Sequence, residues 1–253
     1  MSEFDRHARY YDVEHAGYQE DLAMYAGFAT LAGDDGILEL ACGTGRCLLP
    51  LAESGARVTG LDISPAMLEV ARQKVAARGL GDRVELVQGD MRAFELERGF
   101  RLIVIALNSL MHLATQEEQG AALRCAARHL APGGRVVIDL FNPDVALPDT
   151  AQEGQLFLHC LKLLPESVHL LHFQSPRVDR SAQMIAMANF FDEIAADGTV
   201  KRFVAPFTLR YLTRGELDLL LPKSGLIAEG IYGTYDLDGF RGDSPRLIAV
   251  AGR

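Results

Sequence analysis

Three acidic residues come at or just after the ends of three short apolar runs in the first third of the chain. They are Glu39, Asp62 and Asp90. If these runs are neighbouring parallel strands, the acids line one crevice at the carboxyl edge of the sheet, where open α/β sheets bind ligands. There Asp62 could accept hydrogen bonds from both hydroxyls of a ribose, and Asp90 could accept one from an adenine amine. Three carboxylates in one crevice favour a cationic ligand and oppose a diphosphate.

A pair of glycines follows the first of these runs. Residues 37–46 read ILELACGTGR, in which Gly43 and Gly45 separate an apolar run from a helical pattern. A dinucleotide-binding fingerprint would have a third small residue three positions further on, so that the helix packs closely on the strand. Leu48 stands there instead. Together with the acidic crevice, Leu48 disfavours an NAD(P)-linked oxidoreductase.

Alternating strand and helix patterns must position these residues. Ser64 before Pro65 indicates a helix start, and Thr115 and Thr213 each begin the sequence pattern of a capping box. Hydrophobic periodicity predicts strands at 37–40, 57–62, 84–88, 102–107 and 135–141, with helices at 19–31, 46–54, 65–78 and 116–130. Five such alternations predict a parallel sheet that helices cover on both faces.

The pattern changes after residue 144. From about residue 156 to residue 212, β-like runs occur without a clear amphipathic helix. Hairpin signals separate these runs at PES (165–167), SPRVD (175–179) and ADGT (196–199). We therefore expect an antiparallel β insert at 151–212, acting as a lid or as the surface of a homodimer.

The last part of the chain returns to alternating elements. A helix is predicted from Thr213 to just before Gly225, followed by strands at 226–232 and 246–251. We expect residues 1–150 and 213–253 to form one domain around the insert.

The composition bounds the partners. The chain has 253 residues, 49% of them hydrophobic, and a formal net charge of −9, which disfavours nucleic acid as a partner. The N-terminal segment is too polar for a signal peptide, and no apolar run approaches the roughly 20 residues that cross a bilayer. We expect a cytoplasmic protein without a membrane partner.

No metal site is expected. The four cysteines form no C-x-x-C pair. The histidines His159, His169 and His172 alternate along predicted strands. A metal site would need them to converge with acids, and their spacing offers no i, i+4 helical pair.

The ordered motifs between residues 37 and 142 resemble those of the class I S-adenosylmethionine-dependent methyltransferases. ELACGTG resembles the first motif of that family, GLDIS the second, GDM the third and ALNSLMHL the fourth, and LAPGGRVVIDL resembles the strand that follows. The resemblance implies a Rossmann-like, seven-stranded, mostly parallel sheet with a reversed last strand. Its cofactor carries sulfonium and ammonium charges, in agreement with the acidic crevice. Many members have Asp where this chain has Glu39.

The resemblance also implies which residues bind S-adenosylmethionine. Gly43 and Gly45 would let the backbone approach its methionine part, Asp62 would bind the ribose, and Asp90 with Met91 would flank the adenine. The full set implied for the cofactor is Glu39, Ala41, Cys42, Gly43, Gly45, Asp62, Ile63, Met67, Gly89, Asp90, Met91 and Asn108.

Residues 9–12, RYYD, resemble the opening of members that methylate small molecules, in which an N-terminal segment folds over the cofactor. The C-terminal half is similar in pattern to glycine N-methyltransferase-like and sugar amine N-methyltransferase-like enzymes. This implies Tyr11 as an aromatic residue of the methyl pocket, with simple packing as its alternative role. His112 is the first candidate for a general base, because it lies just after the fourth predicted strand, where the acceptor should lie beside the methyl group. Packing, or capping of the helix that starts at Thr115, is the alternative role for His112.

Three further residues are candidates for contacting the acceptor. Asn142 follows the fifth predicted strand, but it could equally be an ordinary Asn-Pro turn residue. Arg210 and Tyr211 could hold an acidic or hydroxylated acceptor, with an exposed strand end as the simpler interpretation.

The sequence therefore predicts a methyltransferase that acts on a small molecule, with N-methylation favoured over O-methylation. Two alternatives remain: a protein that binds S-adenosylmethionine without turnover, as a regulator or scaffold, and a methyltransferase acting on protein or RNA.

Overall fold

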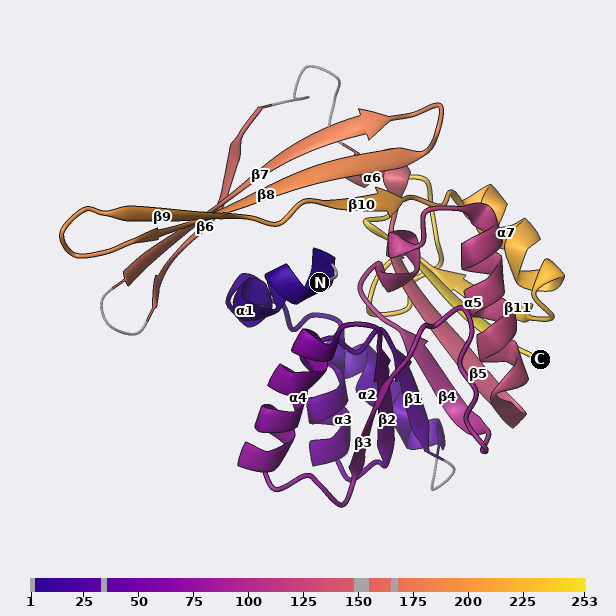
Figure 1. Ribbon diagram of the computed structural model, residues 1–253. Helices are drawn as coiled ribbons and strands as arrows, with labels where there is room; N and C mark the ends of the chain where they lie inside the picture. Colours follow the sequence, from indigo (N-terminus) through magenta and orange to yellow (C-terminus); the bar gives the residue numbers. More distant parts are fainter. Residues whose placement is uncertain (1–2, 33–35, 148–154, 165–167) are drawn as a thin grey trace.

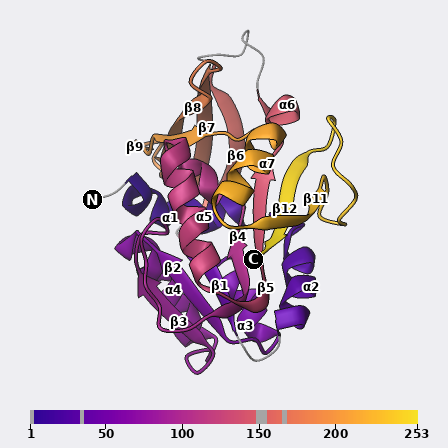
Figure 2. The same ribbon diagram turned by 90° about the vertical axis from the view of Figure 1, so that its right-hand side faces the viewer.

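The computed structural model describes residues 3–32, 36–147, 155–164 and 168–253. Two β-sheets dominate it, one mixed and flanked by helices, the other antiparallel and standing apart above its edge (Figures 1 and 2). No helix in these ranges is long and apolar enough to cross a membrane.

The first sheet has seven strands in the order β11-β12-β5-β4-β1-β2-β3. Only β12 is reversed, because it pairs antiparallel with both β5 and β11 while all other pairs are parallel. This confirms the predicted seven-stranded, mostly parallel, Rossmann-like sheet. The strands are β1 (Ile37–Leu40), β2 (Val58–Asp62), β3 (Val84–Gln88), β4 (Phe100–Ile105), β5 (Leu130–Phe141), β11 (Ile227–Tyr232) and β12 (Arg246–Gly252).

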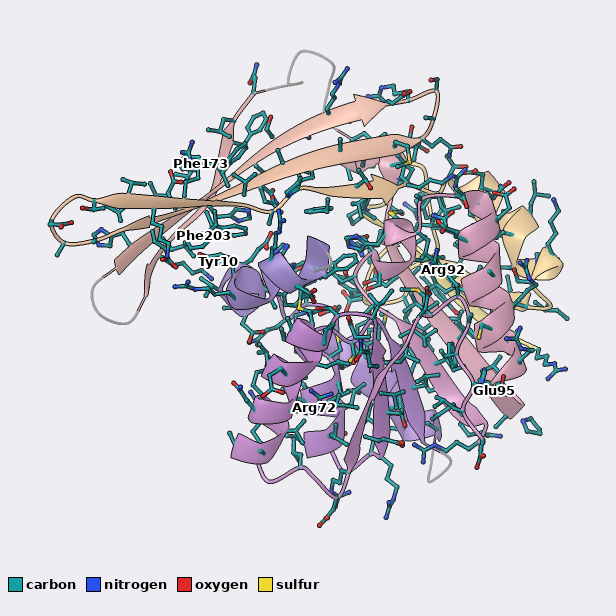
Figure 3. The ribbon with its side chains drawn as sticks, in the orientation of Figure 1. Tyr10, Arg72, Arg92, Glu95, Phe173 and Phe203 are labelled. Atoms are coloured by element: carbon teal, nitrogen blue, oxygen red, sulfur yellow. The ribbon has the colours of Figure 1, made fainter. Side chains whose placement is uncertain are left out.

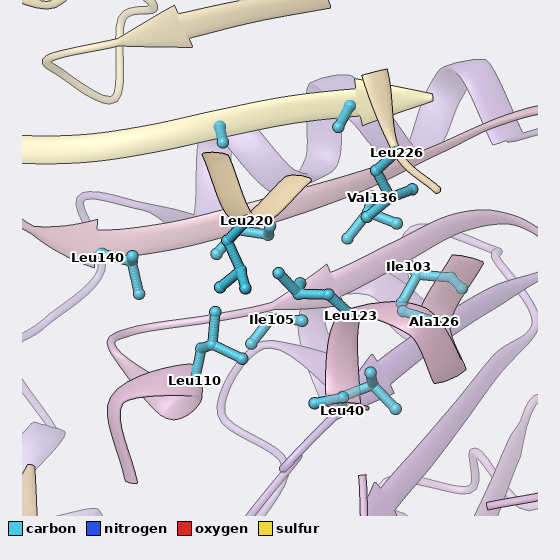
Figure 4. Packing of buried hydrophobic residues seen from close by; sticks show 14 of the residues in the cluster. Leu40, Ile103, Ile105, Leu110, Leu123, Ala126, Val136, Leu140, Leu220 and Leu226 are labelled. Atoms are coloured by element: carbon cyan, nitrogen blue, oxygen red, sulfur yellow. The ribbon is translucent and has the colours of Figure 1, made fainter. Parts of the chain in front are cut away.

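Helices cover both faces of this sheet because its central strands are apolar on both sides. One apolar cluster joins the sheet to α2 (Leu22–Ala32), α3 (Leu48–Glu53) and α4 (Pro65–Ala77), and the other joins it to α5 (Gln116–Arg128) and α7 (Arg214–Lys223). Figure 4 shows the second face, where α5 and α7 pack on β4 and β5; the labelled side chains include Leu123, Ala126, Leu220, Ile103, Ile105, Val136 and Leu140. Burial of each such leucine or isoleucine contributes about 1.5–3 kcal/mol.

The helix starts follow the predicted capping chemistry with one exception. The Ser64 hydroxyl accepts from the Met67 amide at 3.2 Å, and Thr213 forms a complete capping box at α7. At α5, Thr115 accepts from the Glu118 amide, but the Glu118 carboxylate accepts from Ala114 instead of Thr115. The predicted box at α5 is therefore only half formed.

The second sheet is antiparallel, in the order β10-β8-β7-β6, with β9 also paired to β8. Its strands are β6 (Phe157–Leu164), β7 (Val168–Asp179), β8 (Met184–Ile194), β9 (Val200–Val204) and β10 (Phe207–Arg210). The ADGT turn is confirmed between β8 and β9, where Gly198 takes φ +84°. The PES signal lies outside the described residues.

The predicted turn at SPRVD is wrong. Residues 175–179 continue β7 and pair with β8, and the chain reverses at 180–183 instead. Proline is tolerated inside this strand because β6 pairs with β7 only as far as Gln174 in the described part of the chain. Beyond that point Pro176 lies where β7 has a partner on one side, so no ladder hydrogen bond is lost.

An N-terminal helix fills the space between the two sheets. Helix α1 (Glu3–His15) lies beside α4 and beneath the antiparallel sheet (Figure 1). Tyr10 is buried there and stacks on Phe191 of β8, with ring centroids 4.4 Å apart. Figure 3 shows Tyr10 facing Phe203 of β9. Aromatic pairs of this kind add about 0.5–1.5 kcal/mol beyond their burial, so they fix α1 to the insert.

Candidate active site

A cavity of about 680 Å³ lies where the carboxyl ends of β1 to β4 meet α1 and the insert. One side, which we call the sheet-edge wall, contains most residues predicted for the cofactor: Ala41, Gly43, Asp62, Ile63, Met67, Gly89, Asp90, Met91 and Asn108. The opposite side, which we call the roof, comes from α1, from the 3₁₀ turn η2 (Ser109–His112) and from the insert: Phe4, His7, Tyr11, Glu14, His112, Gln174, Ala205 and Phe207. Cavities of this size are typical of small-molecule and cofactor sites.

Asp62 holds two turns of the sheet-edge wall in place. Its carboxylate accepts from the Gly43 amide at 2.8 Å with Oδ2 and from the Ser64 amide at 2.8 Å with Oδ1. Burial raises the pKa of Asp62 above its usual value, although the two amides favour the charged form. Gly43 has φ +55°, which few residues other than glycine adopt readily. Each Asp62 oxygen keeps a lone pair for a ligand in the cavity.

Glu39 is buried behind this wall without lining the cavity. Only 3% of the residue is exposed, and its Oε2 has no hydrogen-bond partner among the described residues. Burial, with smaller contributions from Asp21 and Asp62, raises its pKa to about 8, against the opposing charge of Arg46. A buried carboxyl oxygen without a partner among the described residues fits a ligand that brings a positive charge to this region.

Cys42 and Gly45 also lie behind the lining. A Cβ at Gly60 of β2 would lie 2.7 Å from the Cys42 sulfur, so the turn and the strand are packed in close contact. These two residues shape the turn without reaching the cavity surface.

Arg92 is a wall residue that sequence reasoning missed. It pairs with Asp90 through Nη2 at 2.5 Å, and its guanidinium also contacts Glu118 of α5. The hydrogen bond from Arg92 is the main cause that lowers the pKa of Asp90. Asp90 is therefore a fixed, ionised acceptor. The presence of an arginine two residues after Asp90 was the feature of the sequence that could have predicted this pairing.

The end of β4 is bent sharply into the cavity. Leu107 and Asn108 have φ +43° and +66°, a costly conformation that tends to occur at functional sites. The Asn108 Oδ1 accepts from the Phe141 amide at 2.6 Å, which ties β4 to β5.

Arg246 of β12 also reaches the cavity, and it was not predicted. It forms an ion pair with buried Asp139 at 2.5 Å, and the hydroxyls of Tyr25 and Tyr235 donate to the same carboxylate at 3.0 and 3.2 Å. Because β12 is inserted beside β5 only by the reversed topology, its proximity to the site has no signal in the local sequence.

His112 lies in the roof, near Phe4 and Phe207 at 5.0 and 5.5 Å between ring centroids. Burial, with a smaller contribution from the charge of His7, lowers its pKa to about 4. The imidazole is therefore neutral near pH 7, and its Nδ1 is buried without a partner in the described structure. A proton acceptor with so low a pKa is weak.

Tyr11 lines the same part of the cavity and stacks on His15 at 4.2 Å. Burial raises the pKa of its hydroxyl well above the usual value, so it stays protonated. Tyr11 can therefore donate a hydrogen bond but cannot act as a base near neutral pH.

Three residues predicted for the acceptor lie outside the cavity lining. Asn142 caps α6 (Pro143–Ala146) and donates to the carbonyls of Gly242 and Ser244. Arg210 pairs with Glu216 at 2.7 Å. Tyr211 is in the apolar core, 5% exposed. Their interactions are structural, and we do not retain them as acceptor contacts.

The described residues contain no group of three or more histidines, cysteines or acids that could hold a metal ion. His169 is exposed and His172 is buried, both on β7, whereas the side chain of His159 lies outside the described part of the chain.

Comparisons with known proteins identify the family. A family model described as a methyltransferase domain matches residues 37–134. The cypemycin N-terminal methyltransferase of a Streptomyces species is 38% identical over 217 residues, which are 86% of this chain and 82% of that protein. A dTDP-3-amino-3,4,6-trideoxy-alpha-D-glucopyranose N,N-dimethyltransferase of Streptomyces venezuelae is 37% identical over 145 residues, 55% of this chain and 58% of that protein.

Solved structures agree over the whole chain. The CcbJ methyltransferase of Streptomyces caelestis superposes with a TM-score of 0.85 and 29% identity, covering 100% of this chain and 98% of that one. DesVI of Streptomyces venezuelae gives a TM-score of 0.77 at 25% identity, covering 97% and 98%. These similarities exclude the oxidoreductase alternative. The cofactor is S-adenosylmethionine, and the chain belongs to the class I S-adenosylmethionine-dependent methyltransferases.

Proposed function

We propose that the enzyme methylates an amine nitrogen of a small molecule. The observation that carries this proposal is the two-sided cavity, which offers a cofactor wall with the family's motifs and a separate roof for an acceptor. One relative is named for the N-terminus of cypemycin and another for an amino sugar. An amine nitrogen is the group that these two acceptors share.

We propose that the sheet-edge wall holds the cofactor. Asp62 would accept from the ribose hydroxyls, Asp90 and Met91 would flank the adenine, and Gly43 would let the backbone approach the methionine part. S-adenosylmethionine supplies an activated methyl group on a positively charged sulfur. The protein then needs mainly to align the acceptor nitrogen and exclude water, a proximity effect of about 7–11 kcal/mol.

We propose that the acceptor lies under the roof, between Tyr11, His112 and Phe207. The aromatic rings exclude water there. The protonated Tyr11 hydroxyl and the unpartnered Nδ1 of His112 are available to orient the acceptor.

We also propose the size of the acceptor, the location of the enzyme and the division of its chain. The charge of −9 supports a small acceptor over RNA, and we propose a cytoplasmic enzyme without a membrane partner. We keep 1–150 with 213–253 as the catalytic domain and 151–212 as the insert. Apolar residues exposed on β9 and at the start of β6, among them Phe157, Leu158 and Val200, support the insert as a homodimer surface.

Transfer of labelled methyl groups tests the function. The purified enzyme is incubated with methyl-labelled S-adenosylmethionine and a panel of dTDP-amino sugars and peptides with free N-termini, each paired with an analogue in which a hydroxyl replaces the amine. We expect label on an amine and none on its hydroxyl partner. Label on the hydroxyl compound would establish O-methylation, and label on added protein or RNA would overturn the proposal. Cofactor binding by calorimetry without transfer to any member would favour a binding protein without turnover.

A further inference from the structure

Helix α1 brings a carboxylate and an imidazole together inside the acceptor half of the cavity. The Nε2 of His7 lies 2.5 Å from the Oε2 of Glu14, two helical turns further along α1. Both residues line the cavity, with side chains 13% and 8% exposed. The aromatic rings of Phe191 and Phe207 lie against His7, at 5.6 and 6.4 Å between centroids.

The insert holds Glu14 from the other side. His172 of β7 is completely buried, with its Nδ1 3.8 Å from the Oε1 of Glu14. Gln174, also on β7, donates to the same oxygen at 3.5 Å. Glu14 is therefore fixed between α1 and the antiparallel sheet, so its carboxylate can fix the orientation of the His7 ring.

The local charges keep Glu14 ionised. Burial favours its neutral form, but the hydrogen bond from His7 and the charges of His7, His15 and His172 together lower its pKa. An ionised carboxylate at hydrogen-bond distance stabilises a protonated imidazole. His112 differs in both respects, because it has no carboxylate partner among the described residues and is more deeply buried.

The geometry points to one role: we propose that His7, oriented by Glu14, removes the proton from the ammonium form of the acceptor. This rests on the proposed function, because it requires an amine acceptor. With its Nε2–H donated to Glu14, the ring leaves Nδ1 to accept, and no described residue bonds to that atom. The N–H bond of the acceptor breaks, the proton moves to Nδ1, and the electron pair stays on the nitrogen as the nucleophile that methylation requires.

His7 is the catalytic residue in this proposal, and Glu14 is a positioning residue. The titratable groups that face the pair are Tyr11 and His15 on α1, His112 on η2 and His172 on β7. Tyr11 stays protonated and His112 stays neutral near pH 7. Glu14 is the carboxylate at hydrogen-bond distance from His7.

The first test needs no acceptor. The imidazole N–H protons of the full-length enzyme saturated with S-adenosylhomocysteine are observed by NMR, with His7→Gln used to assign the His7 signal. We expect the proton on Nε2 of His7 to give a signal far downfield, because it is donated to the Glu14 carboxylate, and we expect Glu14→Gln to move that signal upfield. A His7 signal that Glu14→Gln leaves unchanged would overturn the pairing, whatever the acceptor proves to be.

The second test separates a base from a merely structural residue. With the amine that the panel labels, His7→Gln should lower kcat/KM about 100-fold near pH 7. The defect should shrink to a few-fold near pH 10, where the acceptor loses its proton to water. Arg6→Gln, exposed on the same helix and outside the cavity lining, is the matched control and should retain activity throughout.

The outcomes are distinguishable. A defect of His7→Gln that is equal at all pH values would mean that His7 only supports the structure, and it would overturn this proposal while leaving the methyltransferase function intact. Should the panel label no amine, the proposed function fails, and the NMR measurement still decides whether Glu14 accepts a hydrogen bond from His7.

Discussion

The two sides of the cavity are built in different ways. The sheet-edge wall consists of turns that follow β1 to β4, held by backbone hydrogen bonds to Asp62 and by left-handed residues such as Gly43 and Asn108. The roof is assembled from α1 and the insert, whose members lie far apart in sequence and meet through aromatic packing and buried histidines.

This difference separates two tasks. The sheet-edge wall meets a ligand that does not vary within the family, and short turns fix its geometry locally. The roof can change with the insert and α1 without disturbing those turns. Substitutions in the wall should therefore change cofactor binding, whereas substitutions in the roof should change turnover of the acceptor.

The largest effect is expected from Phe191→Ala in the roof. Phe191 is buried and stacks on both Tyr10 and His172, at 4.4 and 4.3 Å. Its removal should lower the free energy of unfolding by about 3–5 kcal/mol and reduce acceptor turnover, with cofactor affinity nearly unchanged. Denaturant unfolding and calorimetry with S-adenosylhomocysteine measure the two quantities. Leu219→Ala on α7, where the side chain is exposed, is the control; equal losses in both variants would contradict the prediction.

Asp62→Ala tests the wall. It removes the acceptor for the Gly43 and Ser64 amides and the proposed acceptor for the ribose. We expect cofactor affinity to fall about 100-fold, equivalent to about 2.7 kcal/mol. Calorimetry with S-adenosylhomocysteine measures the change, and Asp82→Ala, exposed before β3, should have no effect. A loss of only two- or three-fold would mean that the wall does not depend on this carboxylate.

The sequence predicted the wall because parallel strands end at a common edge. Asp62 and Asp90 each come at the end of an apolar run, and that spacing predicted that they lie together. Asn108 was implied only by the resemblance to the family. The same rule over-predicted Asn142, which follows β5 but turns away to cap α6 and bind the 242–244 segment.

The roof could not be predicted in the same way. Glu14 and Gln174 are 160 residues apart, and no spacing relates them. The pairing of His7 with Glu14 depends on helix α1, which packs on both α4 and the insert. Long-range packing of this kind overrides local sequence patterns. The turn predicted at Pro176 was wrong for the same reason, because pairing with β8 keeps residues 175–179 in a strand.

Two buried carboxyl groups, one on each side of the cavity, should make the free energy of unfolding depend on pH in opposite directions. The pKa of Glu39 is raised to about 8, so the folded state holds a proton that the unfolded state loses above about pH 4.5, and stability falls as pH rises through this window. Glu39→Gln should therefore raise the free energy of unfolding at pH 8 and change it little at pH 5.

Glu14 should behave in the opposite way. Its pKa is lowered, so its contribution to stability is present above its unfolded pKa and is lost as pH falls through the folded one. Glu14→Gln should lower the free energy of unfolding at pH 7 and have less effect in acid. Urea unfolding of both variants across pH measures the signs; the same sign for both would contradict the contrast between wall and roof.

The smallest effect is expected from His112→Asn. A pKa of about 4 makes His112 a weak proton acceptor, so its replacement should remove no working base. Asparagine keeps a polar group at the place where the Nδ1 of His112 lies in the wild type. We expect kcat/KM to fall less than about five-fold, with the shape of the pH profile unchanged, in contrast to His7→Gln. Initial rates from about pH 6 to pH 10 measure both variants together. A larger defect in His112→Asn, or one that disappears at high pH, would return the role of base to His112.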